Sequence, residues 1–170
     1  MKILKQPSFL ILFFLISCAT TSNFSKNDLK NEYFKNKTII FTFNQNSENF
    51  VSYDGPRAGL EHQPNVKEVF KKSIEELAVE TKLDLKFKET YAEANNSETH
   101  IDAEIKEILW VFNLSSATMK TSINYNLKNK NKVYKINSSY KNMTGGDEKN
   151  NLIRSFKIAN YSLLKELEKE

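Results

Sequence analysis

The chain has few of the residue types that most protein metal sites use as ligands. Its 170 residues include one cysteine, two histidines, four glycines and three prolines. A single cysteine cannot form an internal disulfide. His100 and Asp102 put two possible ligands on one face of an expected strand, but protein metal sites need three or four. We therefore interpret His100 and Asp102 as solvated polar residues and predict no metal and no cofactor.

Catalytic patterns are also missing. The sequence contains no G-x-S-x-G nucleophile elbow. The Gly145-Gly146 pair stands where phosphate can bind before a helix, but it lacks the Lys-Ser/Thr of a P-loop. We predict that the protein is not an enzyme.

The only long apolar run is Phe9–Ile16, after Lys2 and Lys5. It is about half of the roughly 20 residues needed to cross a bilayer. A basic start, a short apolar run and small residues after it are typical of a secretory signal peptide.

The residues that follow, Leu15-Ile16-Ser17-Cys18, resemble the lipobox of bacterial lipoproteins. The resemblance implies that residues 1–17 are a signal peptide cleaved before Cys18, that Cys18 carries lipid, and that this lipid is the membrane partner. Two acyl chains suffice for stable attachment. The alternative is that Cys18 belongs to an ordinary signal peptide cleaved nearby. Residues 18–36 are polar and predict a flexible tether, so we expect a single α/β domain over residues 37–170.

Charge gives no sign of a nucleic-acid partner. Without Lys2 and Lys5, the chain has 25 − 2 = 23 basic residues and 21 acidic residues. The basic residues are dispersed among Glu and Asn. A nucleic-acid site would need a clustered basic face.

Hydrophobic spacing predicts the order β-α-β-β-β-β-α. Asn65 with Glu68 fits a helix capping box, and Gly145-Gly146-Asp147 precedes the last helix. The expected strands are 37–43, 83–88, 99–115, 117–128 and 133–140, with helices after Asn65 and after Asp147. The last three strands follow one another as a meander. From Ile108 onward, both faces of the strand become apolar, which indicates a bulge or a locally buried segment.

These elements predict an α+β two-layer sandwich: a mostly antiparallel sheet of about five strands, with two amphipathic helices on one face. The other face is expected to be open and polar. Its residues are Asp102, Glu104, Lys120, Ser122, Asn124, Lys135 and Asn137. The strand aromatics are expected in the core rather than in a binding groove. They are Trp110, Phe112, Tyr125, Tyr134 and Tyr140.

The polar stretch Ser52–Gln63 concentrates residues that are rare elsewhere in the chain, including Arg57 and His62. Long loops of this kind often carry function. We predict Asp54, Arg57 and His62 as a partner-binding loop. The alternative, in which Asp54 and Arg57 only pin the turn at Gly55, stays open.

The whole pattern resembles the YajG-type envelope lipoproteins and, more loosely, lipopolysaccharide-assembly and transport-auxiliary lipoproteins. Asp54-Gly55-Pro56-Arg57 is similar to the Asp/Arg segment after their first strand, with looser spacing. The resemblance implies a non-enzymatic accessory with an envelope protein partner. Ala19, rather than Asp, after Cys18 implies sorting to the outer membrane, facing the periplasm. The alternative is a surface-exposed or secreted, adhesin-like interaction protein.

Overall fold

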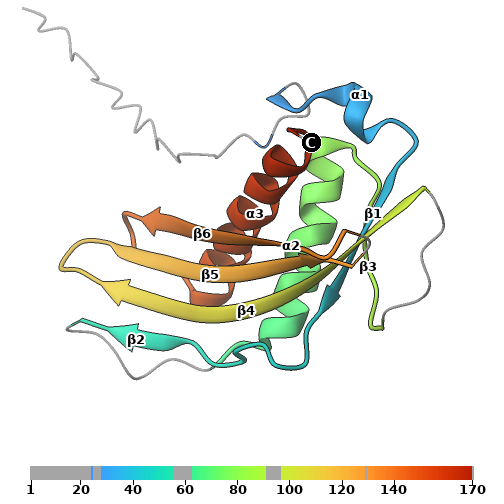
Figure 1. Cartoon of the computed structure of the whole chain (residues 1–170). Coiled ribbons are helices and arrows are strands. Elements are labelled where there is room, and N and C mark those ends of the chain that lie inside the picture. Colours follow the sequence, from blue (N-terminus) through green and yellow to red (C-terminus); the bar gives the residue numbers. More distant parts are fainter. Residues whose placement is uncertain (1–23, 25–27, 56–62, 91–96, 129, 170) are drawn as a thin grey trace, which may run out of the picture.

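The computed structural model describes residues 24, 28–55, 63–90, 97–128 and 130–169. Within these ranges the chain forms three helices and six strands (Figure 1). In chain order they are α1 (Asn31–Phe34), β1 (Thr38–Phe43), β2 (Ser52–Asp54), α2 (Val66–Thr81), β3 (Leu85–Phe87), β4 (Glu98–Phe112), β5 (Ala117–Leu127), β6 (Lys132–Asn142) and α3 (Glu148–Leu167). All seven predicted elements are present, and α1 and β2 are additional.

The strands form one mixed sheet in the order β3-β1-β4-β5-β6, with β2 paired to β4 beyond the end of β1. The expected meander is confirmed, because β4, β5 and β6 pair antiparallel in sequence. The prediction of a mostly antiparallel sheet of about five strands is confirmed only in part, because the described sheet has six strands and is mixed. β1 is parallel to β3 and β4, and β2 is parallel to β4. The helical crossover through α2 accounts for the parallel pairing of β1 and β3, since parallel neighbours need a long connection.

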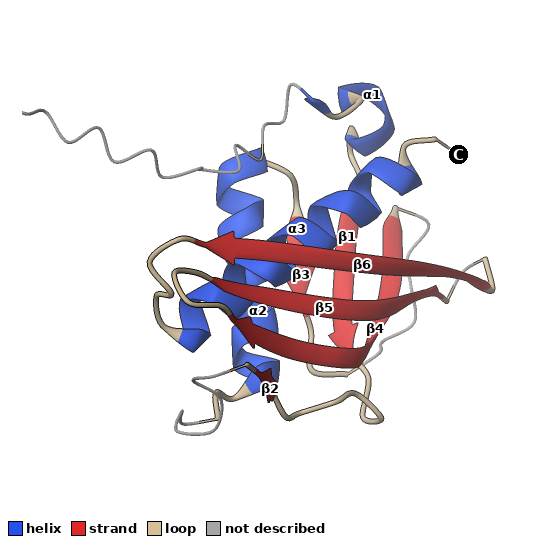
Figure 2. Cartoon of the chain, turned by 90° about the vertical axis from the view of Figure 1, so that its left-hand side faces the viewer, coloured by secondary structure: helices blue, strands red, loops and turns tan. Residues whose placement is uncertain are grey.

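Both long helices lie on one face of the sheet, as Figures 1 and 2 show from two directions. The α+β class and the helices on one face are therefore confirmed. The Asn65 cap is also present, since its side chain accepts a hydrogen bond from the backbone N–H of Glu68 at 3.1 Å. Asp147 caps α3 in the same way, through the N–H of Asn150 at 2.9 Å. Among the described elements, no helix covers the opposite face.

Strand β4 is long and contains the bulge that the apolar pattern predicted. Ile105 pairs with Ile123, but Glu107 pairs with the next residue, Ser122, so Lys106 is the extra residue. An extra residue reverses the in-and-out alternation of the strand after that point. The residues that face the helices are Ile101, Ala103 and Ile105 before the bulge, and Ile108, Trp110 and Phe112 after it. The bulge thus keeps the apolar residues of both halves in one core.

A chain of buried polar groups links the sheet to both long helices. The Tyr125 hydroxyl on β5 donates to Asn160 Oδ1 on α3 at 2.7 Å, and Asn160 Nδ2 donates to Ser73 Oγ on α2 at 3.1 Å. Ser73 Oγ in turn donates to the Phe70 carbonyl at 2.6 Å. Burial raises the pKa of Tyr125 well above its usual value, so its hydroxyl stays protonated and donates.

The segment just before β1 packs on the domain, although it lies in the range predicted as a tether. Leu29, only 4% exposed, and Phe34 belong to the core. The backbone N–H of Lys30 donates to Glu168 Oε2 at 2.7 Å, so this segment contacts the end of α3. The described domain therefore includes residues 28–36 and does not begin at Lys37. Residues 18–23 and 25–27 lie outside the described residues.

Replacement of Leu29 tests this boundary. We expect Leu29→Ala to lower the free energy of unfolding by about 2–4 kcal/mol, the usual cost of truncating a buried leucine. The control is Leu114→Ala, since Leu114 is 88% exposed and its truncation should change stability by less than about 0.5 kcal/mol. Urea unfolding of both variants measures the difference. Equal stability of the two variants would show that residues 28–36 do not contribute to the fold.

Candidate functional site

The predicted partner-binding loop is described only at its two ends. Asp54 is exposed at the end of β2, while Arg57 and His62 lie outside the described residues. The described residues therefore include only one of the three predicted loop residues. Cys18, the predicted lipidation site, also lies outside the described residues.

Two residues fix the ends of this loop against the fold. At Gly55 the backbone has φ +104°, and a Cβ atom there would stand 2.1 Å from the Phe112 carbonyl oxygen. Only glycine fits such a close approach in this conformation. At the other end, the Gln63 side chain accepts from the Val51 N–H at 2.8 Å and donates to the Val51 carbonyl at 3.0 Å. These contacts favour a pinned loop base, formed by Gly55 and Gln63 rather than by Asp54.

A small polar cluster lies beside the loop base. The Tyr53 hydroxyl donates to Glu148 Oε1 at 2.8 Å and accepts from Gln63 Nε2 at 2.9 Å. Its ring lies 6.3 Å from that of Trp110 in the core. Glu148 is buried in the first turn of α3, where the helix dipole favours a carboxylate. The cluster thus joins β2, α3 and the start of α2, and positions the loop base.

Sequence reasoning missed Tyr53, Gln63 and Glu148. Gln63 and Glu148 are ordinary polar residues near predicted helix starts, and nothing in their local pattern marks either as a partner of Tyr53, which lies 95 positions from Glu148. The aromatic expectation was better: Trp110, Phe112 and Tyr125 are buried in the core, as predicted, and Tyr134 packs against it partly buried.

The interpretation of His100 and Asp102 as solvated residues is wrong. His100 is only 1% exposed and Asp102 only 8% exposed. They lie on the sheet face opposite the helices, next to β1, whose Ile40 pairs with His100 and is also buried. The alternating pattern identified the face correctly, but it does not report what covers that face.

Asp102 is held by three groups that suit a carboxylate. Thr42 Oγ1 donates to its Oδ1 at 3.1 Å, Asn44 Nδ2 donates to its Oδ2 at 2.6 Å, and Lys128 Nζ lies 3.3 Å from Oδ2. His100 Nε2 lies 3.2 Å from Glu98 Oε2. Within the described part of the chain, no three His, Cys, Asp or Glu side chains are grouped as a metal site would require. Asp102 acts as a structural anion that ties β1 to β4 and β5.

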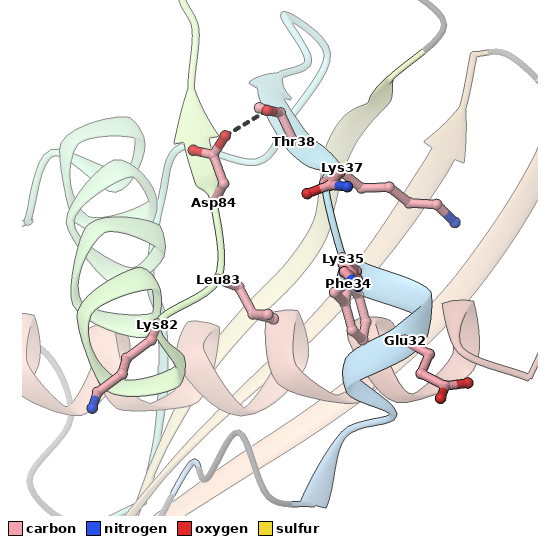
Figure 3. Close-up of a pocket in the computed structure, with 9 residues that line it drawn as sticks. Glu32, Phe34, Lys35, Lys37, Thr38, Lys82, Leu83 and Asp84 are labelled. Carbon is pink, nitrogen blue, oxygen red and sulfur yellow. Dashed lines mark hydrogen bonds between the residues drawn. The ribbon is translucent and has the colours of Figure 1, made fainter.

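A groove of about 620 Å³ opens between α1 and the turn from α2 to β3 (Figure 3). Leu83 and Phe34 face one another within it, while the ammonium groups of Lys82 and Lys37 point outward. Its lining residues are Glu32, Phe34, Lys35, Asn36, Lys37, Thr38, Lys82, Leu83 and Asp84. The Thr38 hydroxyl donates to Asp84 at 2.5 Å, and this hydrogen bond holds the pKa of Asp84 below its usual value. The carboxylate of Asp84 in this groove is thus already hydrogen-bonded to Thr38.

Ser138 on β6 is hydrogen-bonded within the core. Its hydroxyl contacts Thr121 Oγ1 at 2.7 Å and donates to the Ser155 carbonyl at 2.8 Å. All three residues are buried between the sheet and α3. These hydrogen bonds tie β6 to β5 and to α3.

No helix in the described residues is long and apolar enough to span a membrane.

Replacement of Asp102 tests its structural role. We expect Asp102→Ala to lower the free energy of unfolding by about 2–3 kcal/mol, because hydrogen bonds to a charged, buried group are lost. Glu104→Ala is the control on the same strand face, since Glu104 pairs only with the exposed Lys106 and such pairs contribute about 0–1 kcal/mol. Thermal unfolding compares the two variants. A cost for Asp102→Ala no larger than that of the control would refute the role.

Comparison with known proteins gives no family. No family model matches the chain, and no curated protein matches it. Several solved structures resemble it at low similarity, and three of them follow. An uncharacterised protein has 6% identity and a TM-score of 0.38, covering 79% of this chain and 91% of its own. A hypothetical protein from Chlamydia trachomatis has 16% identity and a TM-score of 0.37, covering 77% and 93%. The PelC dodecamer from Paraburkholderia phytofirmans has 5% identity and a TM-score of 0.40, covering 79% and 91%.

Proposed function

We propose that the protein is a lipid-anchored lipoprotein of the bacterial cell envelope that binds an envelope protein as a non-enzymatic accessory of assembly or transport. The observation that carries the proposal is Leu15-Ile16-Ser17-Cys18 at the end of the apolar run Phe9–Ile16. A short apolar run followed by small residues is the anatomy of an export signal. Lipid on Cys18 would attach the domain stably, since two acyl chains suffice.

The arrangement of the domain supports the presentation of a binding surface away from the anchor. α1, the first described helix, contacts the end of α3 and lies at the top of Figure 1. β2 and the start of α2 lie at the opposite end. The predicted partner-binding loop begins after β2. An anchor that enters through α1 would therefore hold this loop base toward the envelope space rather than toward the lipid.

For the location, we propose the outer membrane with the domain facing the periplasm. Ala19 follows Cys18, and no acidic cluster follows within the next few residues. The lipoprotein resemblance connects a residue other than Asp in this place with outer-membrane sorting. The second candidate is a surface-exposed, adhesin-like protein, which would use the same anchor.

Substitution of the lipobox cysteine tests the anchor. We expect Cys18→Ala to abolish palmitate labelling and to release the protein from the membrane fraction, because it removes the acylated thiol. Ser17→Ala is the matched control, since it keeps a small residue before the cysteine and should leave labelling and attachment unchanged. Membrane attachment of the Cys18→Ala protein at the level of the unmodified chain would overturn the proposal.

Protease treatment of intact cells, applied to the same strains, separates the two locations. A periplasmic domain stays intact until the outer membrane is permeabilised, because the protease cannot reach it. Digestion in unbroken cells would contradict the periplasmic location and support the surface alternative.

A further inference from the structure

The β5–β6 hairpin carries a net positive charge, because it contains lysines and no acidic residue. From Asn113 to Gly146 there is no Asp or Glu, and there are six lysines. These lysines are Lys120, Lys128, Lys130, Lys132, Lys135 and Lys141. The rest of the chain then carries 25 − 6 = 19 basic residues and all 21 acidic ones. The basic residues are thus dispersed along the chain, as expected, and the β5–β6 hairpin differs in having no acidic residue among them.

The second strand of the hairpin, β6, is an edge strand of the sheet. β6 pairs with β5 on one side and, among the described strands, with none on the other. It is the outermost long strand in Figure 2, with α3 behind it. Lys120, Lys135 and Lys141 are exposed on the face that the helices leave open, and no described carboxylate forms an ion pair with them. An edge strand presents a row of backbone N–H and C=O groups that another strand can pair with.

Asp102 of β4 forms an ion pair with Lys128, just after β5, but the described carboxylates of β4 form no ion pair with Lys135 or Lys141 of β6. Asp102, Glu104 and Glu107 lie on β4, and they pair with the uncharged Asn126, Asn124 and Ser122 of β5. β6 is therefore two strand spacings from these carboxylates, or about 9–10 Å. That is close to the Debye length of about 8–10 Å at ordinary ionic strength, so attraction across β5 is weak.

Contacts with α3 fix the position of β6. Ser138 is bonded to Ser155 of α3, and the Arg154 guanidinium lies 5.3 Å from the centre of the Tyr140 ring. A strand already fixed in its bound conformation loses little entropy when a partner adds to it. The edge is thus both unpaired and preorganised.

We infer that β6 is a docking edge for an extended acidic segment of a partner protein, which adds to the sheet as a further strand. This inference rests on the proposed function, because it names the surface and the partner class of the proposed accessory. Main-chain hydrogen bonds supply affinity in this mode of recognition, and side chains supply selectivity. Pairing of two β6 edges from two copies would bring two rows of lysines together, which like-charge repulsion opposes.

Peptide binding to the full-length protein in detergent tests the inference. The probe is a fluorescent peptide of alternating Thr and Glu, about as long as β6, and its counterpart has Lys in place of Glu. We expect only the Glu peptide to bind, and we expect it to slow hydrogen exchange at β6 amides. Lys135→Gln/Lys141→Gln should weaken binding about tenfold, since two exposed charge pairs are lost.

The matched control is Lys86→Gln/Lys88→Gln, which removes the same charge at the opposite end of the sheet, on and just after β3. It should change binding less than about twofold. Equal weakening by both double variants, peptide binding without protection of β6 amides, or binding to phosphatidylglycerol vesicles but not to the peptide would each overturn the inference.

The peptide-binding test and the lipid-anchor test can fail independently of one another. If the peptide fails to bind while Cys18 is labelled with palmitate, the docking edge is refuted and the anchored lipoprotein stands. If Cys18→Ala leaves the protein on the membrane, the anchor is refuted whatever the peptide does.

Discussion

The fold depends on the bulge at Lys106 in β4. β4 is the strand that joins the parallel part of the sheet to the meander, because it pairs with β1 and β2 on one edge and with β5 on the other. Without an extra residue, the in-and-out alternation set by Ile101 would turn Ile108 and Trp110 away from the helices. With it, both halves of the strand bury their apolar side chains under α2 and α3.

This one-sided core shapes the rest of the molecule. Because both long helices cover the same face, the sheet keeps one face without a helix and one long edge, β6. The buried Tyr125–Asn160–Ser73 chain fixes both helices to the sheet. β6 in turn is hydrogen-bonded to α3 through Ser138 and Ser155. The surfaces available for a partner are therefore the loop base at β2, the groove at α1 and the β6 edge. Of these, the β6 edge has the most distinct chemistry, since it carries charge of one sign.

Much of the fold was predictable because its signals are local. The Asn65 cap, the alternation along β5 and the apolar residues on both sides of Lys106 are each read within a few positions. The parallel pairing of β1 with β4 was not predictable in the same way, since an isolated strand pattern does not state its partner. β2 has only three residues, which is too short for a periodic pattern. Leu29 and Phe34 are isolated apolar residues in a polar stretch, so their burial had no periodic signal either. For the site, Asp54 of the predicted loop is the exposed last residue of β2, and the Gln63–Val51 and Tyr53–Glu148 contacts arise only from the folded chain.

The most direct test of this account is the deletion of Lys106. Deletion removes the extra residue, so one half of β4 must turn its apolar side chains toward solvent or lose its pairing with β5. We predict loss of cooperative unfolding or a decrease in the free energy of unfolding of more than about 4 kcal/mol, comparable to emptying a core position. Lys106→Ala keeps the bulge and should change stability by less than about 0.5 kcal/mol. A deletion variant that unfolds cooperatively at the same urea concentration as the Lys106→Ala variant would contradict the account.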